Sequence, residues 1–194
     1  MMTEREKMER GDWYDPGADA ELRAARHRAS DLCHTFNQML PSDRAGHLAI
    51  LRELFGYVGD HANVLSPLQV DYGYNVSLGD RSFINHGAYL MDCAPITIGN
   101  DVFIGPNLGA YTAQHPLVAA ERNLGVERAL PITIEDDCWL GGDVKIMPGV
   151  TIGRGCVIGA GSIVTRDIPA GMLAVGNPCR PVRKITEADR AGLL

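Results

Sequence analysis

The sequence predicts a mainly β protein, built as a triangular β-solenoid with a helical segment before it and a short helix after it. An aliphatic residue recurs every six residues through much of the chain. Glycine is abundant, with 22 residues, whereas aromatic residues make up only 6%. Because an α-helix has about 3.6 residues per turn, a strict period of six cannot stay on one helical face. A narrow solenoid accounts for the period and for the scarcity of large side chains.

Residues 1–60 form the predicted helical segment. One helix is expected from Asp19 to about Met39, since Asp19 suits an N-cap and Pro41 ends the segment. A second is expected from Ser42 to Gly56. The first helix shows the three- and four-residue spacing of an amphipathic face, at Leu22, Ala25, Ala29, Leu32, Phe36 and Met39.

The solenoid is predicted over residues 61–170. Its second half has glycines at 141, 153 and 159, which we expect to relieve the backbone at the turns. An earlier block keeps the phase at Leu78, Ile84 and Leu90 and, after two extra residues, at Ile98, Ile104 and Ala110. The later aliphatic positions are Ile134, Leu140, Ile146, Ile152, Ile158 and Val164.

Three such hexapeptides make a coil of 18 residues, and neighbouring coils lie about 4.8 Å apart. Residues 18 positions apart should therefore stack. Ile134 should lie on Ile152, and Cys138 on Cys156. We expect this cysteine pair to be small inward-facing residues, with a disulfide as the less favoured alternative.

An excursion is predicted at residues 113–130. Ile98 and Ile134 lie 36 residues apart, the length of two coils, but the segment between 113 and 130 shows no repeat. One coil and a loop of roughly 18 residues account for this gap. Long loops on rigid scaffolds frequently carry function.

Residues 171–194 form a closing segment, in which Thr186 and Asp189 predict a capping box for a short final helix. This segment has four basic and two acidic residues, whereas residues 61–170 have six basic and eleven acidic residues. The net charge of −6 argues against a general nucleic-acid binder. The basic end of this acidic molecule suits an anionic ligand.

The same composition predicts a cytoplasmic protein without a membrane segment. The first ten residues are too charged for a signal peptide, and no apolar run approaches about 20 residues. The five cysteines include no C-x-x-C pair, which favours reduced thiols and gives no support to a cysteine-rich metal site.

Four motifs stand beside the hexapeptide repeat: Asp71-Tyr-Gly-Tyr-Asn75, Tyr111-Thr-Ala-Gln-His115-Pro116, Trp139-Leu-Gly-Gly142 and Gly176-Asn-Pro-Cys-Arg180. Together with the repeat, they resemble the maltose and galactoside O-acetyltransferases, and the resemblance covers nearly the whole chain. That family implies a left-handed parallel β-helix, acetyl-CoA as the acetyl donor, no metal, and a homotrimer with active sites between subunits.

The resemblance implies a catalytic and acceptor site centred on His115. Histidine titrates near neutrality and suits a base that takes the proton of a sugar hydroxyl. We expect either Glu127 or a backbone carbonyl to orient its ring. Asn85 is expected to contact the acceptor and the reaction centre. Further acceptor contacts are expected from Asp71, Asp92, Trp139 and either Asp15 or Asp19.

The donor site is implied on the same basis. Gly142 and Ala160, 18 residues apart, should form one wall along which pantetheine lies, with Trp139 beside it. Thr165 and Arg166 should extend that track. Arg180 and Arg183 should bind the nucleotide phosphates.

Three alternatives stay open from the sequence. The nearest is an acetyltransferase of the same fold for an antibiotic, another xenobiotic or a lipo-oligosaccharide. A γ-type carbonic anhydrase would need three histidines on zinc, and only His86 and His115 suit that purpose. The third is a solenoid scaffold protein without catalytic activity, which would not explain why His115, Asn85 and the terminal arginines occur together.

Overall fold

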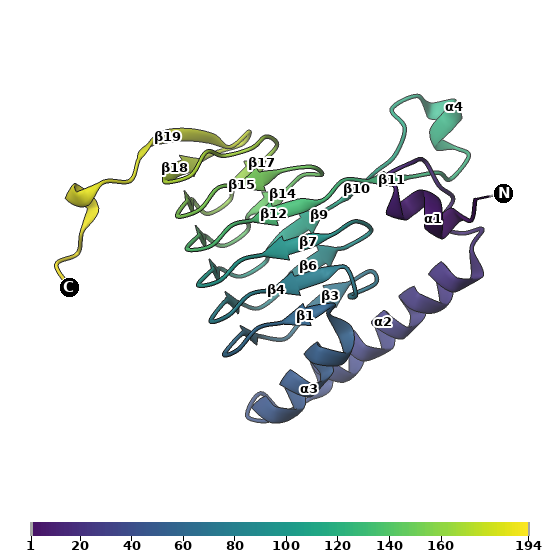
Figure 1. The fold of residues 1–194 in the computed structure, drawn as a ribbon, viewed down its shortest axis with the longest axis horizontal. Coiled ribbons are helices and arrows are strands. Elements are labelled where there is room, and N and C mark those ends of the chain that lie inside the picture. Colours follow the sequence, from purple (N-terminus) through teal and green to yellow (C-terminus); the bar gives the residue numbers. More distant parts are fainter. Residues whose placement is uncertain (1, 194) are drawn as a thin grey trace.

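The computed structural model describes residues 2–193 and has three N-terminal helices beside a long prism, of which the second and third pack against one end of it and the first lies next to the excursion (Figure 1). The helices are α1 (Glu4–Glu9), α2 (Ala20–Gln38) and α3 (Arg44–Leu54). Asp19 caps α2 by accepting from the N–H groups of Glu21 and Leu22, as predicted. Ala29, Cys33 and Phe36 of α2 join the apolar core of the prism, so the helices close its first coil.

The prism has three faces of parallel strands, which the chain visits in turn. Face 1 contains β1 (Tyr57–Val58), β4 (Val76–Leu78), β7 (Ile96–Ile98), β12 (Ile132–Ile134) and β15 (Thr151–Ile152). Face 2 contains β2 (Asn63–Val64), β5 (Phe83–Ile84), β8 (Phe103–Ile104), β13 (Trp139–Leu140), β16 (Val157–Ile158), β18 (Met172–Val175) and the antiparallel β19 (Arg180–Lys184). Face 3 contains β3 (Leu68–Val70), β6 (Ala88–Met91), β9 (Gly109–Tyr111), β14 (Lys145–Ile146) and β17 (Ile163–Val164). We name the corners the 1–2, 2–3 and 3–1 edges.

The strand register confirms the predicted parallel β-helix of stacked coils. Ile134 pairs with Ile152 on one side and with Ile98 on the other, so the excursion lies within a single coil. Cys138 and Cys156 are buried free thiols. The solenoid also extends beyond the predicted limits of 61 and 170, because β1, β18 and β19 lie in the sheets without a complete hexapeptide signature.

The glycines that follow the aliphatic residues serve close packing between coils, which corrects the predicted reason for them. A Cβ on Gly141 would lie 2.6 Å from the backbone nitrogen of Ala160, and one on Gly153 would lie 2.5 Å from that of Ala170. The left-handed turn conformation is adopted by other residues, including Asp137 with φ of 62°.

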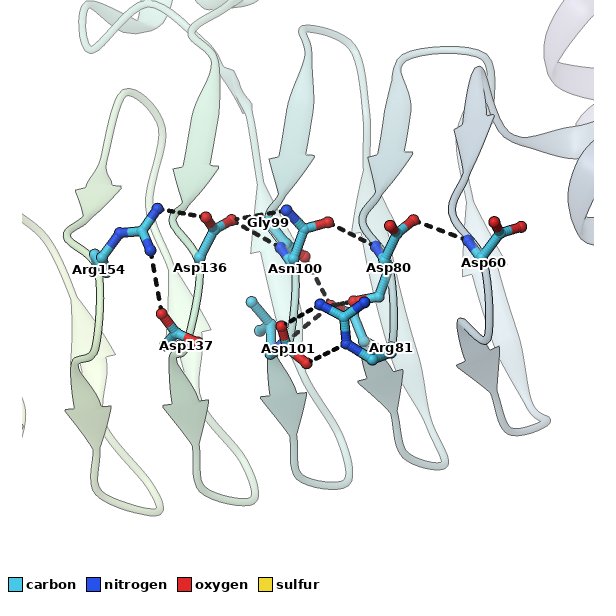
Figure 2. Close-up of polar contacts among 11 residues, drawn as sticks. Asp60, Asp80, Arg81, Gly99, Asn100, Asp101, Asp136, Asp137 and Arg154 are labelled. Atoms are coloured by element: carbon cyan, nitrogen blue, oxygen red, sulfur yellow. Dashed lines mark hydrogen bonds and ion pairs between the residues drawn. The ribbon is translucent and has the colours of Figure 1, made fainter.

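The 1–2 edge is held by a ladder of side chains that accept from backbone N–H groups (Figure 2). The N–H of Asp60 donates to Asp80 at 2.9 Å, and the N–H of Asp80 donates to Asn100 at 2.8 Å. Asn100 in turn donates its N–H to Asp136 at 2.8 Å, and Arg154 pairs with Asp136. The side chains of this ladder therefore serve as hydrogen-bond acceptors for the backbone N–H groups of the turns.

The excursion leaves the prism at the 3–1 edge as a two-stranded ribbon (Figure 1). Its strands β10 (Ala113–Gln114) and β11 (Arg128–Ala129) pair antiparallel, and α4 (Ala119–Arg122) lies at its tip. The predicted final helix is a single 3₁₀ turn, η1 (Glu187–Asp189). Within residues 2–193, no helix combines the length and the apolar character that a membrane crossing requires.

Candidate active site

His115 follows β10 directly and is exposed. Its Nδ1 lies 2.9 Å from the carbonyl oxygen of Val126 across the ribbon. A carbonyl oxygen can only accept, so Nδ1 carries the proton and donates. The lone pair is then on Nε2, which can accept a proton as a general base. Of the two predicted orienting groups, this geometry selects the backbone carbonyl.

Glu127 therefore does not make the predicted contact with the imidazole. Its carboxylate accepts a hydrogen bond from the hydroxyl of Tyr14, which is 1% exposed. The same two residues form an antiparallel bridge, in which each N–H donates to the other's carbonyl at 2.9 Å. Burial raises the pKa of the Tyr14 phenol, so it remains a donor at neutral pH.

Asp92 is fully buried, which corrects its predicted contact with the acceptor. Its carboxylate accepts from the N–H groups of Asp71 at 3.0 Å, Tyr72 at 2.8 Å and Asn75 at 3.2 Å. Burial raises the pKa of Asp92 to about 6, with opposing contributions from the N–H groups of Tyr72 and Asn75. A side chain without solvent exposure cannot contact a ligand in this conformation, and Asp92 instead orders the turn between β3 and β4.

Asp71 belongs to that turn and lies at the 3–1 edge beside the excursion. Its Oδ1 accepts from the hydroxyl of Tyr89 at 2.6 Å, and its Oδ2 lies 3.5 Å from the thiol of Cys93. Its side chain remains partly exposed. Asp71 therefore keeps the access to solvent that an acceptor contact needs.

The two alternatives left open near the N-terminus also differ in their contacts. Both carboxylate oxygens of Asp19 accept from backbone, Oδ1 at the start of α2 and Oδ2 from Arg5. Asp15 uses Oδ1 for the N–H groups of Gly17 and Ala18. Among the contacts of the described residues, Oδ2 of Asp15 has no such partner, which favours Asp15.

Asn85 lies at the 2–3 edge, on the opposite side of face 3 from His115. The corner residues of successive coils stack there, because the N–H of Asn85 donates to Ile104 and that of Gly105 donates to Leu140. Strand β6, which joins the two edges in the Asn85 coil, has four residues. At about 3.3 Å per residue, the edges are about 13 Å apart.

Gly142 and Ala160 continue the 2–3 edge above Asn85. Gly142 accepts at its carbonyl from Gly161, whose N–H lies 2.8 Å away. Trp139 begins the strand that leads into this corner and is 56% exposed on face 2. Arg180 pairs with Val175 at the end of β18, so it lies beside the same edge.

Thr165 and Arg166 lie on a different edge, which corrects the single donor track predicted from the sequence. They follow β17, whose Val164 pairs with Ile146, and this places them at the 3–1 edge with His115. One hexapeptide further along the chain leads to the next corner of a triangle. Both side chains are exposed.

Arg183, the second predicted phosphate ligand, has a carboxylate partner in this structure. Its guanidinium donates to the two carboxylate oxygens of Asp189 at 2.7 and 2.8 Å. This contact holds the pKa of Asp189 at about 2. Both groups are at the surface, where such a pair contributes little to stability, so an incoming phosphate can replace the carboxylate.

Sequence reasoning missed the cluster that surrounds Asp71 and Glu127. Arg26 of α2 donates to the hydroxyl of Tyr72 at 2.7 Å and to the carbonyl of Pro16 at 2.8 Å. Cys93 is buried, and burial raises the pKa of its thiol. The string Asp71-Tyr-Gly-Tyr-Asn75 pointed to one part of this cluster, but no local pattern links it to α2.

A metal centre finds no support in the part of the chain that the structure describes. No group of three or more histidine, cysteine, aspartate or glutamate side chains within residues 2–193 is arranged to hold an ion. The five cysteines are free thiols, and each is buried.

Comparisons with known proteins agree on one family. A profile described as the maltose acetyltransferase hexapeptide capping motif matches residues 7–59, and the bacterial transferase hexapeptide profile, with six repeats, matches residues 131–166. A Staphylococcus aureus protein named only as an acetyltransferase is 51% identical over 184 residues, which is 95% of this chain and 92% of that protein.

Two solved structures are similar over nearly their whole length. A maltose O-acetyltransferase from Clostridium difficile 630 is 45% identical, with a TM-score of 0.94 over 96% of this chain and 99% of the other. A galactoside acetyltransferase in complex with coenzyme A is 36% identical, with a TM-score of 0.94 over 97% and 94% of the two chains.

Proposed function

Since this chain belongs to the maltose and galactoside O-acetyltransferase family, we propose that it transfers an acetyl group from acetyl-CoA to a hydroxyl of a sugar-like acceptor. The observation that carries the proposal is the pairing of His115 Nδ1 with the carbonyl of Val126, which leaves Nε2 as an exposed base. A hydroxyl is a poor nucleophile until such a base removes its proton.

The proposed reaction is direct transfer in a ternary complex. His115 Nε2 takes the proton of the acceptor hydroxyl while the acceptor oxygen attacks the thioester carbonyl. The carbon–sulfur bond then breaks, and the imidazolium returns the proton to the departing CoA sulfur. No acyl-enzyme is part of this proposal, because no serine or cysteine lies in the motif of His115 and all five cysteines are buried.

An N–H at the turn after β13 is the proposed donor to the oxyanion. The N–H of Gly141 donates to Ile158 and that of Asp143 donates to Pro106. Among the described residues, the N–H of Gly142 has no carbonyl partner. It is therefore the member of this turn that remains available to the developing negative charge.

The proposed site requires two copies of the chain. His115, Asp71, Thr165 and Arg166 lie at the 3–1 edge, whereas Asn85, Gly142, Ala160 and Arg180 lie at the 2–3 edge. A rigid prism about 13 Å wide keeps these groups apart. If the 3–1 edge of one subunit faces the 2–3 edge of the next, each interface has a complete set, and closure around a threefold axis gives a homotrimer.

Mixed trimers test this arrangement. His115→Ala and Asn85→Ala chains with different affinity tags are co-expressed, and trimers containing both are purified. In any such trimer one interface joins an intact His115 to an intact Asn85, so roughly a third of the wild-type activity returns. If both homotrimers are inactive and the mixed trimers are also inactive, the site is built within one chain. If the His115→Ala enzyme keeps most of its activity, His115 is not the general base and the proposal is contradicted.

The acceptor is the open part of the proposal. Consumption of acetyl-CoA over a panel of mono- and disaccharides, nucleosides, antibiotics and lipo-oligosaccharides identifies it. Turnover of maltose or a galactoside supports a sugar enzyme, whereas turnover confined to an antibiotic supports the xenobiotic alternative. The cytoplasmic location also remains a prediction.

A further inference from the structure

Tyr14 connects the N-terminal arm to the catalytic loop across 113 positions of the chain. It is 1% exposed and lies in a buried apolar cluster with Met8, Leu22, Tyr72, Cys93, Ala94 and Ala129. Its hydroxyl donates to the carboxylate of Glu127, and its backbone N–H and carbonyl are both hydrogen-bonded to the backbone of Glu127. A buried phenol needs a hydrogen-bond partner, so this pair fixes where Glu127 lies.

Glu127 is adjacent to Val126, whose carbonyl orients the imidazole of His115. The segment from Leu117 to Gly125 is exposed, so the structure around Val126 depends on its anchors. Two lie next to it among residues 2–193. One is the ribbon pairing, in which Gln114 pairs with Arg128, and the other is the bridge to Tyr14.

We propose that Tyr14 and Glu127 form a positioning pair, which holds the Val126 carbonyl in place and thereby fixes the tautomer and direction of His115. The inference rests on the proposed role of His115 and goes beyond it, because it assigns a function to two side chains that do not contact the substrate. Glu127 acts through the backbone, with its carboxylate held by Tyr14. The arm and the excursion are thus coupled parts of one site.

The physical basis is the choice between two neutral forms of the ring. Only the Nδ1–H form can donate to Val126, and only this form has a lone pair on Nε2. If the carbonyl moves by a few tenths of an ångström or turns away, the Nε2–H form becomes populated, and in that form Nε2 cannot accept a proton. Small displacements of catalytic groups can reduce turnover severalfold to a hundredfold.

The test uses Tyr14→Phe, which removes the hydroxyl but keeps the ring in its apolar cluster and the backbone bridge. We expect kcat to fall about tenfold, with the KM for acetyl-CoA changed less than about twofold. Nitrogen-15 NMR of His115 should show the Nε2–H tautomer appearing beside the Nδ1–H form. Glu127→Gln still presents an oxygen to Tyr14 and should keep most of the activity, whereas Glu127→Ala should resemble Tyr14→Phe.

Tyr57→Phe is the matched control, because Tyr57 is an exposed tyrosine on face 1, and it should leave kcat and the tautomer unchanged. A Tyr14→Phe enzyme with wild-type kcat and a single Nδ1–H tautomer would overturn the positioning pair, provided that His115→Ala is inactive. If His115→Ala is itself active, the proposed function fails first, so the two failures are distinguishable.

Discussion

At the scale of single residues, burial decides what a carboxylate can do. Asp92 and Asp71 were both predicted to contact the acceptor. Asp92 has no exposed surface, whereas Asp71 is partly exposed. Three backbone N–H groups satisfy the charge of Asp92, yet burial still raises its pKa to about 6. The groups that face it are Asp71, Tyr72 and Asn75 of the turn that it orders, and Tyr74 and Cys33 are close enough to interact with it electrostatically.

The raised pKa of Asp92 has a sign that stability measurements can check. The ordinary pKa of an aspartate carboxyl is 3.8, so between about pH 4 and 6 the folded protein binds a proton that the unfolded chain does not. Its contribution to the free energy of unfolding therefore falls as pH rises, by about 3 kcal/mol in all. We expect wild type to lose about this much stability relative to Asp92→Asn between pH 4 and 7 in urea titrations.

Asp101→Asn is the control, because Arg81 lowers the pKa of the exposed Asp101 carboxyl and the expected trend has the opposite sign. If the stability of wild type relative to Asp92→Asn does not change between pH 4 and 7, the pKa of Asp92 is not raised in the folded protein and the prediction is wrong.

At the scale of the corner element, two adjacent glycines have different functions. Gly141 stacks so closely on the next coil that a Cβ would meet the backbone nitrogen of Ala160 at 2.6 Å. A Cβ on Gly142 would instead meet the ring of Pro106 at 3.4 Å, an ordinary contact. Gly141 is therefore needed by the fold, whereas Gly142 is free to serve the proposed donor site.

Alanine at each position separates these roles. Gly141→Ala should lower the free energy of unfolding by about 2 kcal/mol, because backbone must move to admit the methyl group. Gly142→Ala should change it by less than about 0.5 kcal/mol. It should raise the KM for acetyl-CoA about five- to tenfold, because the methyl group occupies the pantetheine wall. Thermal unfolding and steady-state kinetics measure both, and a Gly142→Ala enzyme with unchanged KM would contradict the donor assignment.

At the scale of the whole molecule, the three faces differ in chemistry. Face 1 presents a polar column of Ser77, Thr97, Thr133 and Thr151. On face 2 the paired Phe103 and Trp139 are 55% and 56% exposed. Large apolar side chains that stack on a regular surface mark an interaction site. Face 2 is therefore the expected partner-facing surface of the proposed trimer.

A charge in this aromatic column should break the assembly. Phe103→Asp should sediment at 21.0 kDa, whereas wild type should sediment at about three times that mass. Activity should be lost with the assembly, because each edge then has half of the proposed site. Tyr57→Asp places the same charge on face 1, where Tyr57 is 56% exposed, and should leave the trimer intact. A Phe103→Asp protein that remains trimeric would assign the interface elsewhere.

Much of the fold could be predicted because its signals are local. The six-residue period defines the coils, Asp19 starts α2, and the missing repeat between 113 and 130 locates the excursion. The candidate site was less predictable. His115 lies in a motif, but its orienting carbonyl belongs to Val126, and a backbone group has no signature in side-chain patterns.

The sequence by itself determined the cross-section of the prism, since a repeat of aliphatic residues fixes which side chains point inward and how coils stack. Only the tertiary structure decided which edge each candidate residue occupies. It also decided that Asp92 is buried and that Tyr14 reaches Glu127. The physical reason is that these outcomes depend on contacts between distant segments, which form when the coils stack and the N-terminal arm packs on the excursion.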